Sequence, residues 1–386
     1  MNILIKNILL DMKNILNRRI LEHKITDNYV SYILFVHLYN LYFNIKDYRL
    51  IDLIIEEFER SEHQFLTNNS FWYGKAGIGY ALSIIDKEIY HEKIEKYKKD
   101  VELYLRMLCK EPDIFTYGHR TYDLFFGMAG CCLFLLEVDS KNNICVEKCL
   151  DTIIYNINVS DDKLSKFKIN KKYTRNIFIK KISYDYYVDL GKAHGLAGIL
   201  KILKICKNKH YKNDGMDKAI SKIENFYHNG KNNLNYNLWN RIYPSKEYYE
   251  ENNSWCYGNL GIITSLYDNK DKKTYFYINK VKKNCLNRIK NGSITNYFFC
   301  HGIIGEIFMI NQYDCDFCKN EEIKKYYDNI IKEIDRLDLE KVPEKFALDN
   351  IFSILDGVFS IIAVYLFLYC EFDKYFFERM FLIEVG

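Results

Sequence analysis

The sequence predicts an all-α protein in which helix pairs repeat and close into a ring, an α/α toroid. Three observations support this fold class. A Gly-x-x-Gly motif recurs along the chain, each copy begins an apolar run, and amphipathic stretches separate these runs. A length of 386 residues would allow two or three domains. The repeat instead favours one domain over residues 1–386.

The glycine motif marks the apolar helices. Its five copies begin at Gly74, Gly127, Gly195, Gly258 and Gly302, and a degenerate sixth begins at Gly357. One such motif carries little information, whereas five copies that each open an apolar stretch indicate an internal repeat. We therefore expect buried helices over residues 78–85, 131–138, 199–206, 262–267 and 307–310.

Amphipathic helices are expected between the apolar ones. Residues 90–109 and 320–339 place apolar side chains three and four positions apart, which predicts one buried stripe and one wet face. Residues 51–65 supply this helix for the first glycine copy, and residues 2–21 and 29–43 form a pair without glycines. Seven pairs result. A ring buries the apolar helices inside, and an open solenoid is the alternative.

Composition and charge exclude several classes of protein. Only 3 prolines interrupt the chain, which permits many helices, and a net charge of +4 without a basic tract argues against a nucleic-acid partner. The longest uncharged apolar run, residues 357–370, is 14 residues long, whereas a membrane span needs about 20. The N-terminus lacks the apolar run of a secretory signal. We therefore expect a cytoplasmic protein whose 12 cysteines do not form a disulfide scaffold.

Two segments exceed the repeat. Residues 160–189 include an alternation of β-branched and aromatic residues at 173–184, which predicts a small strand insertion or hairpin. Residues 232–253 are polar and aromatic and contain Pro244. We expect this second segment to be a long loop near the functional end of the protein, since loops carry sites.

The repeat aligns side chains with metal-binding chemistry. The residues directly before each repeat glycine are Tyr73, Phe126, His194, Tyr257, His301 and Asp356, and those two before are Trp72, Phe125, Ala193, Cys256, Cys300 and Leu355. Equivalent positions of a ring lie at one end of it. His194, Cys256, Cys300 and His301 should therefore converge at one mouth.

Two thiols and one imidazole from neighbouring loops predict a zinc site made of Cys256, Cys300 and His301. Three protein ligands with an open fourth position are typical of catalytic zinc, and helix N-termini favour thiolates. The alternative is a set of ordinary buried cysteines with a hydrogen-bonded histidine. A second Cys pair, Cys315 and Cys318, has no partner pair and is interpreted as structural or incidental.

His194 has two interpretations. It could be a fourth ligand, which would close the zinc site, or an acid/base residue oriented by Asp123. Asp123 lies four residues before Gly127, where it could instead cap a helix. Trp72, Tyr73, Trp255 and Tyr257 would line the mouth or belong to an aromatic core, and the sequence leaves both alternatives open.

Several of these motifs together resemble the LanC-type lanthipeptide cyclases, the lanthionine synthetase C-like family. The matching motifs are Trp255-Cys256-Tyr257-Gly258, Cys300-His301-Gly302, Gly191-Lys-Ala-His194-Gly195-Leu-Ala-Gly198 and Tyr122-Asp123 before Gly127-Met-Ala-Gly130. The similarity extends from about Trp72 to the C-terminus. It implies an α/α toroid in which Cys256, Cys300 and His301 bind zinc. It also implies that His194, Asp123 and Tyr257 match positions linked to catalysis.

Two departures from the family pattern indicate a divergent member. The family usually has an Arg four residues before the first zinc Cys, where this chain has Asn252. The role of that Arg is not carried over, and nothing in the sequence shows whether nearby Arg241 substitutes for it. The Gly-x-Pro-Gly variant common after the Trp-Cys-Tyr motif is also absent, since Asn259 and Leu260 stand there.

The resemblance implies a zinc-dependent cyclase in the biosynthesis of antibiotic peptides. The expected reaction is Michael-type addition of a peptide Cys thiol to dehydroalanine or dehydrobutyrine, with His194 as the acid that protonates the α-carbon. His194 could also remove the thiol proton first, and the sequence leaves the order of these steps open. The expected partners are a dehydrated precursor peptide, a separate dehydratase and an export transporter, through which the protein would contact the membrane. Two alternatives stay open: a non-catalytic scaffold that binds the precursor peptide, and a related protein that adds glutathione or a protein thiol to another electrophile.

Overall fold

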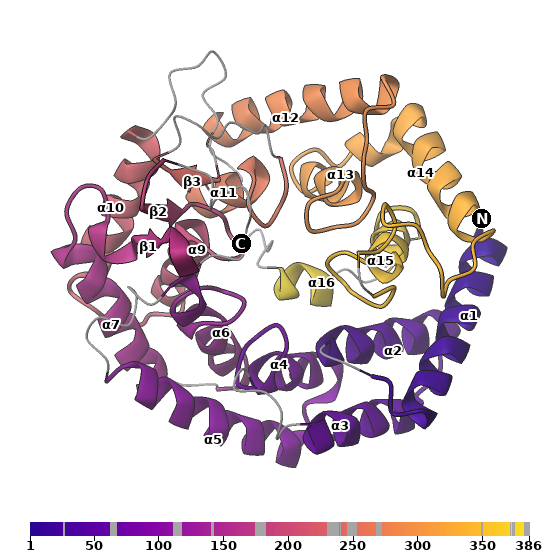
Figure 1. Ribbon diagram of the computed structural model, residues 1–386, viewed down its shortest axis with the longest axis horizontal. Helices are drawn as coiled ribbons and strands as arrows, with labels where there is room; N and C mark the ends of the chain where they lie inside the picture. The colour runs from indigo at the N-terminus through magenta and orange to yellow at the C-terminus, as the bar shows by residue number, and fades with distance from the viewer. Residues whose placement is uncertain are drawn as a thin grey trace. The chain divides into compact units, whose positions relative to one another are not determined.

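The computed structural model describes residues 1–25, 28–61, 68–110, 118–139, 143–173, 183–229, 239, 241–244, 253–267, 272–348, 350–370, 372 and 375–381. These residues form fifteen α-helices and three short strands (Figure 1). The chain divides into two compact units. We call Thr67–Tyr267 the central unit, and Met1–Leu66 with Asp268–Gly386 the terminal unit. The single domain expected over residues 1–386 stays a prediction.

The central unit consists of two rows of helices. One row is apolar: α4 (Lys75–Asp86), α6 (Met128–Val138), α9 (Leu196–Asn208) and α11 (Asn259–Leu266) contact one another in that order. The other row contains α5 (His91–Leu108), α7 (Ile144–Val159) and α10 (Met216–Asn229). Chain order alternates between the rows, as the repeated pair of amphipathic and apolar helices predicts.

The terminal unit brings the two ends of the chain together. It contains α1 (Asn2–Leu21), α2 (Tyr29–Phe43), α3 (Arg49–Ser61), α12 (Lys272–Lys290), α13 (Ile303–Asn311), α14 (Glu321–Ile334), α15 (Val358–Tyr369) and α16 (Tyr375–Met380). Helix α1 packs on α14. The amide of Ile354 donates to Ser31 Oγ over 3.2 Å, and Asn350 Nδ2 donates to the Tyr32 hydroxyl over 2.8 Å. These contacts join the first and last helix pairs within the terminal unit.

Burial separates the two kinds of helix. In α6 every residue except Glu137 is buried, whereas α14 buries only one stripe, made of Ile323, Tyr327, Ile330, Ile331 and Ile334. Burial of each large aliphatic side chain contributes roughly 1.5–3 kcal/mol, so the apolar row dominates the core. In chain order, α1–α7 and α9–α15 match the seven predicted pairs, and α16 is additional.

Close backbone contacts explain the glycine motif. Gly127 is the N-cap of α6, and a Cβ atom there would lie 2.5 Å from the Asp123 amide nitrogen. A Cβ atom on Gly130 would lie 2.0 Å from the carbonyl oxygen of Leu124, six residues upstream. The same contact recurs at Gly305, 1.9 Å from the Phe299 oxygen. At these glycines the loop before the helix thus folds back onto the first turn, and only glycine leaves room for it.

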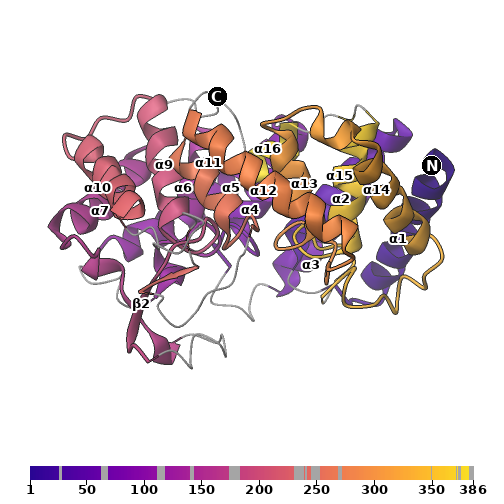
Figure 2. The same ribbon diagram turned by 90° about the horizontal axis from the view of Figure 1, so that it is seen from above.

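A three-stranded antiparallel sheet adds to the central unit beyond the ends of its helices (Figure 2). Strands β1 (Ile169–Asn170) and β2 (Tyr186–Asp189) come from the expected insertion at 160–189. Strand β3 (Ile242–Tyr243) comes from the segment 232–253, which we expected to be a loop, and Val188 pairs with Tyr243. Residues 174–182 of the expected hairpin and most of residues 232–253 lie outside the described residues.

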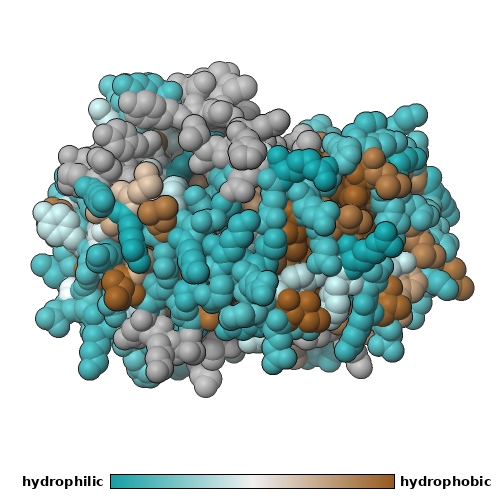
Figure 3. Space-filling model, turned by 90° about the horizontal axis from the view of Figure 1, so that it is seen from below, coloured by the Kyte–Doolittle hydropathy of each residue, from teal (hydrophilic) through white to brown (hydrophobic). Residues whose placement is uncertain are grey.

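One face of the molecule is mostly hydrophilic (Figure 3). On the face shown in Figure 3, hydrophobic residues form separate small patches. Exposed hydrophobic side chains such as Leu103 and Met107 of α5 lie among charged neighbours. In the part of the chain that the structure describes, each helix is too short or too polar to cross a membrane.

Candidate functional site

Backbone hydrogen bonds join the loops that precede the apolar helices of the central unit. The Trp72 amide donates to the Phe125 carbonyl over 3.0 Å, and the Leu124 amide donates to the Ala193 carbonyl over 3.2 Å. The Ala193 amide donates to the Cys256 carbonyl over 3.1 Å. The residues two before each repeat glycine therefore lie side by side, as the repeat predicts.

The residues directly before the glycines form a stacked row of rings. Ring centroids of Tyr73 and Phe126 are 5.7 Å apart, those of Phe126 and His194 5.8 Å, and those of His194 and Tyr257 5.4 Å. We call these four residues the ring row. Its members are partly exposed. The row holds the His194 imidazole between two flat aromatic faces.

A second aromatic layer lies beneath the ring row and is fully buried. Trp72 and Phe125 stack at 4.6 Å, and Phe125 lies 5.8 Å from Trp255. Trp72 is 2% exposed and Trp255 is 1% exposed. Of the two interpretations of the aromatic residues, the core therefore fits Trp72 and Trp255, and Tyr73 and Tyr257 remain partly accessible.

Asp123 both caps a helix and contacts His194. Its Oδ1 accepts hydrogen bonds from the amides of Phe126 and Gly127, at 2.6 and 2.9 Å. Its Oδ2 lies 2.7 Å from His194 Nδ1, and the Asp123 side chain is completely buried. The two alternatives that the sequence left open are realised by the two oxygens of one carboxylate.

The His194 imidazole is held in its neutral form. Burial is the main reason why the pKa of His194 is lowered to about 4. The nearby Asp189 carboxylate raises this pKa, whereas the Arg241 and Arg120 charges lower it further. The ring is neutral at pH 7 as a result. A carboxylate accepts hydrogen bonds, so Nδ1 donates to Asp123 and the ring lone pair is on Nε2.

The sequence did not single out Asp189, and it singled out Arg241 without a role. The Arg241 guanidinium carbon lies 3.5 Å from the centre of the Tyr257 ring, and its Nε lies 4.0 Å from Asp189 Oδ2. Asp189 is buried at the end of β2, and its Oδ1 accepts the Gly191 amide. Burial raises the pKa of Asp189, and the Arg241 charge opposes that rise.

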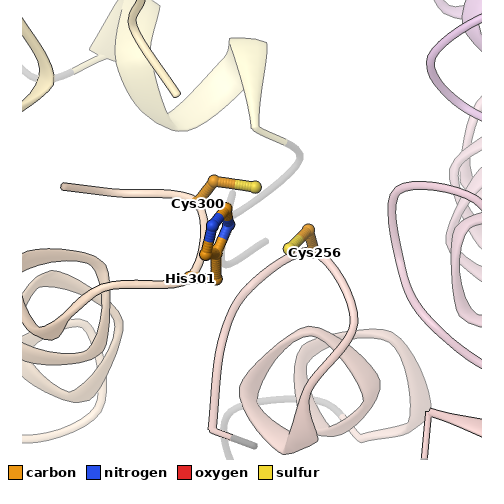
Figure 4. A group of neighbouring side chains, drawn as sticks. All are labelled: Cys256, Cys300 and His301. Carbon is orange, nitrogen blue, oxygen red and sulfur yellow. The ribbon is translucent and has the colours of Figure 1, made fainter. Parts of the chain in front are cut away.

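The predicted metal ligands come from two loops. Cys256 precedes α11, and Cys300 and His301 precede α13 (Figure 4). Their ligand atoms lie within 4.8 Å of one another. Cys256 and Cys300 are buried, whereas His301 is partly exposed. Two thiols and an imidazole are donors that zinc takes in three-ligand sites, so the residues fit zinc by donor chemistry.

The loop before α13 repeats the register of the central unit. The Cys300 amide donates to the Leu355 carbonyl over 2.7 Å, so the positions two before Gly302 and Gly357 lie side by side. Cys315 is exposed and Cys318 is buried. Among the described residues, neither belongs to a group of three metal-binding side chains.

One of the departures from the family pattern has a structural role. Asn259 is buried in the first turn of α11, where its Oδ1 accepts the Trp239 amide over 3.0 Å. Its Nδ2 donates to Asn253 Oδ1 over 3.3 Å. Asn259 therefore ties Trp239 to the helix. Asn252 lies outside the described residues.

Comparisons with known proteins agree with this architecture. The solved structure of nisin cyclase superposes with a TM-score of 0.74 over 98% of each chain, at 18% sequence identity. That agreement shows that the fold is the α/α toroid predicted from the repeat. Nisin biosynthesis protein NisC of Lactococcus lactis subsp. lactis is 24% identical over 375 residues, 92% of this chain and 81% of that protein. The sequence model of the lanthionine synthetase C-like proteins matches residues 31–382, and this chain belongs to that family.

Proposed function

We propose that this protein is a lanthipeptide cyclase, which adds the Cys thiols of a precursor peptide to dehydroalanine or dehydrobutyrine. The observation that carries the proposal is the His194–Asp123 pair, 2.7 Å apart and stacked beside Tyr257 in a member of this family. Such a pair moves a proton, and thiol addition needs one proton removed from sulfur and one delivered to carbon.

We propose that Cys256, Cys300 and His301 hold a zinc ion. Helices α11 and α13 begin at Asn259 and Ile303, and each cysteine lies two residues before the N-cap glycine, so a positive helix end lies close to it in the chain. When bound, zinc lowers the pKa of a substrate thiol so that it reacts as the thiolate. As an acid/base residue, His194 is not a fourth ligand.

His194 carries the proton in this reaction. Its neutral ring accepts the thiol proton at Nε2, and Asp123 stabilises the imidazolium that forms. The sulfur then bonds to the β-carbon of the dehydroamino acid, and the carbon–carbon π electrons move to give an enolate. The imidazolium returns the proton to the α-carbon, which completes the thioether without loss or gain of atoms.

Tyr257 orients the proton carrier. Its ring stacks on His194 with an interplanar angle of 30°, which restricts rotation of the imidazole. Phe126 stacks on the same imidazole at 13°. A fixed ring raises the rate because the proton donor stays aligned with the reacting carbon.

The proposed reaction implies partners. The substrate is a dehydrated precursor peptide, so a separate dehydratase must act first, and an export transporter would remove the product. We propose a cytoplasmic location, with membrane association through these partners.

The test is incubation of the purified zinc-loaded protein with a dehydrated precursor peptide, followed by thiol alkylation and mass spectrometry. We expect the peptide thiols to become resistant to alkylation, and His194→Asn to abolish this protection. His91→Asn, at an exposed position on α5, is the matched control. Thiols that stay alkylatable with wild-type protein would contradict the proposal. Peptide binding without protection would then favour a scaffold, and modification only of glutathione would favour the third alternative.

A further inference from the structure

Arg241 makes an unusually close contact with the proposed site. Its guanidinium carbon lies 3.5 Å from the centre of the Tyr257 ring. The corresponding distance between Arg379 and Tyr375 is 4.8 Å. At 3.5 Å the two planar groups are in van der Waals contact, where a cation over a ring is attracted most strongly.

The small sheet fixes this contact. Strand β2 pairs with β3 through Asp189 and Ile242, and the Leu190 amide donates to the Arg241 carbonyl over 2.8 Å. Strand β2 leads directly into the loop that carries His194. The sheet thus connects the Arg241 backbone to the loop that carries His194. The Arg241 side chain contacts Tyr257, the residue after the proposed ligand Cys256.

Charge holds the guanidinium in this position. The Arg241 side chain is 18% exposed and the Asp189 side chain 4% exposed, and the ion pair joins them over 4.0 Å. A buried carboxylate needs a positive partner, because an isolated charge is strongly destabilised away from water. Asp189 therefore restricts where the guanidinium lies, and Tyr257 contacts both Arg241 and His194.

We propose that Arg241 is a positioning residue for the reaction. It holds the Tyr257 ring against His194 and places a fixed positive charge beside these two side chains. The inference rests on the proposed function. It gives the strand insertion a purpose, because β2 and β3 deliver Asp189 and Arg241 to a site otherwise built from helix-capping loops. It also gives Tyr257 a support that the repeat itself does not supply.

The test is a double-mutant cycle with kcat and KM measured separately for cyclisation. We expect Arg241→Met to lower kcat about 30-fold, the effect of losing a desolvated cation–ring contact, with KM changed less than about 3-fold. Tyr257→Leu should have a similar effect. The double variant should be only about 2-fold worse than the poorer single variant, since both remove one contact.

Arg241→Lys and Arg379→Met complete the design. Lysine keeps the charge but not the planar fork, so we expect recovery of part of the kcat lost in Arg241→Met. Arg379→Met removes a cation–ring contact in α16 and should leave kcat unchanged. Thermal melting and zinc content of each variant identify a loss of folding. If Arg241→Met does not fold, Arg241→Lys becomes the test of the proposal. A kcat of Arg241→Lys equal to that of the wild type would refute the role of Arg241.

Two further outcomes would overturn the inference in different ways. Independent effects of Arg241→Met and Tyr257→Leu, about 900-fold together, would show that Arg241 does not act through Tyr257. A wild-type protein that leaves all peptide thiols alkylatable would refute the proposed function, and the role of Arg241 with it.

Discussion

Two loops of the central unit use the same register in different ways. Ser70 and Asp123 each lie four residues before a repeat glycine. Ser70 Oγ accepts the Tyr73 amide over 3.3 Å, and Asp123 Oδ1 accepts the equivalent Phe126 amide over 2.6 Å. Ser254 and Ser353 cap their loops in the same way. The carboxylate differs from the hydroxyl by its second oxygen, which holds His194. The capping position thus gains a second contact through one more acceptor.

The largest expected effect comes from removing the group that the second oxygen holds. His194→Asn should lower the cyclisation rate about 10²–10⁴-fold, since a positioned acid/base residue contributes that much. Single-turnover mass spectrometry measures the rate. A decrease of less than about 3-fold would remove His194 from the mechanism.

The loop of Ser254 sharpens the comparison, because it is capped by a serine but carries Cys256 two positions later. Wild-type protein should bind about one zinc per chain, as a three-ligand site predicts, and Cys256→Ala should weaken binding at least about 10-fold. Elemental mass spectrometry after dialysis measures the metal. Cys315→Ala is the control, and equal zinc in both variants would contradict the ligand assignment.

Loss of both oxygens should destabilise the fold. Asp123→Ala leaves the Phe126 and Gly127 amides and the His194 ring without their buried acceptor. We expect the free energy of unfolding to fall by about 3 kcal/mol, the sum of a lost cap and an unsatisfied buried donor. Urea denaturation measures it, and a decrease below about 1 kcal/mol would show that the cap is dispensable.

The smallest effect is expected where the cap has no second role. Ser70→Ala removes one hydrogen bond to the Tyr73 amide and should lower the free energy of unfolding by about 1 kcal/mol. Its cyclisation rate should stay within about 2-fold of wild type. A large loss of activity without loss of stability would mean that Ser70 also belongs to the site.

The repeat predicted the parts of this structure that follow a period. The spacing of glycines placed His194 and Tyr257 in one row, and apolar runs such as residues 131–138 lie within the observed helices. Each of these follows from local sequence. The start of α6 at Met128, directly after Gly127, shows why the motif marks helix beginnings.

The partners of Asp189 and Tyr257 could not be predicted in this way. Strands β2 and β3 have four and two residues, too few to show an alternating pattern, and 52 residues separate Asp189 from Arg241. The double role of Asp123 was also hidden. Its spacing fitted both a cap and a contact to His194, and only the positions of the two oxygens show that it makes both.

Asp123→Ser tests the central claim most directly, because it converts the Asp123 loop into a copy of the Ser70 loop. Unfolding and cyclisation are measured on the same preparation. The account predicts a folded, zinc-binding protein that loses about 2 kcal/mol of stability, less than Asp123→Ala, since serine keeps the cap but not the acceptor of His194, with cyclisation at least about 10²-fold slower. Cyclisation at the wild-type rate would contradict it.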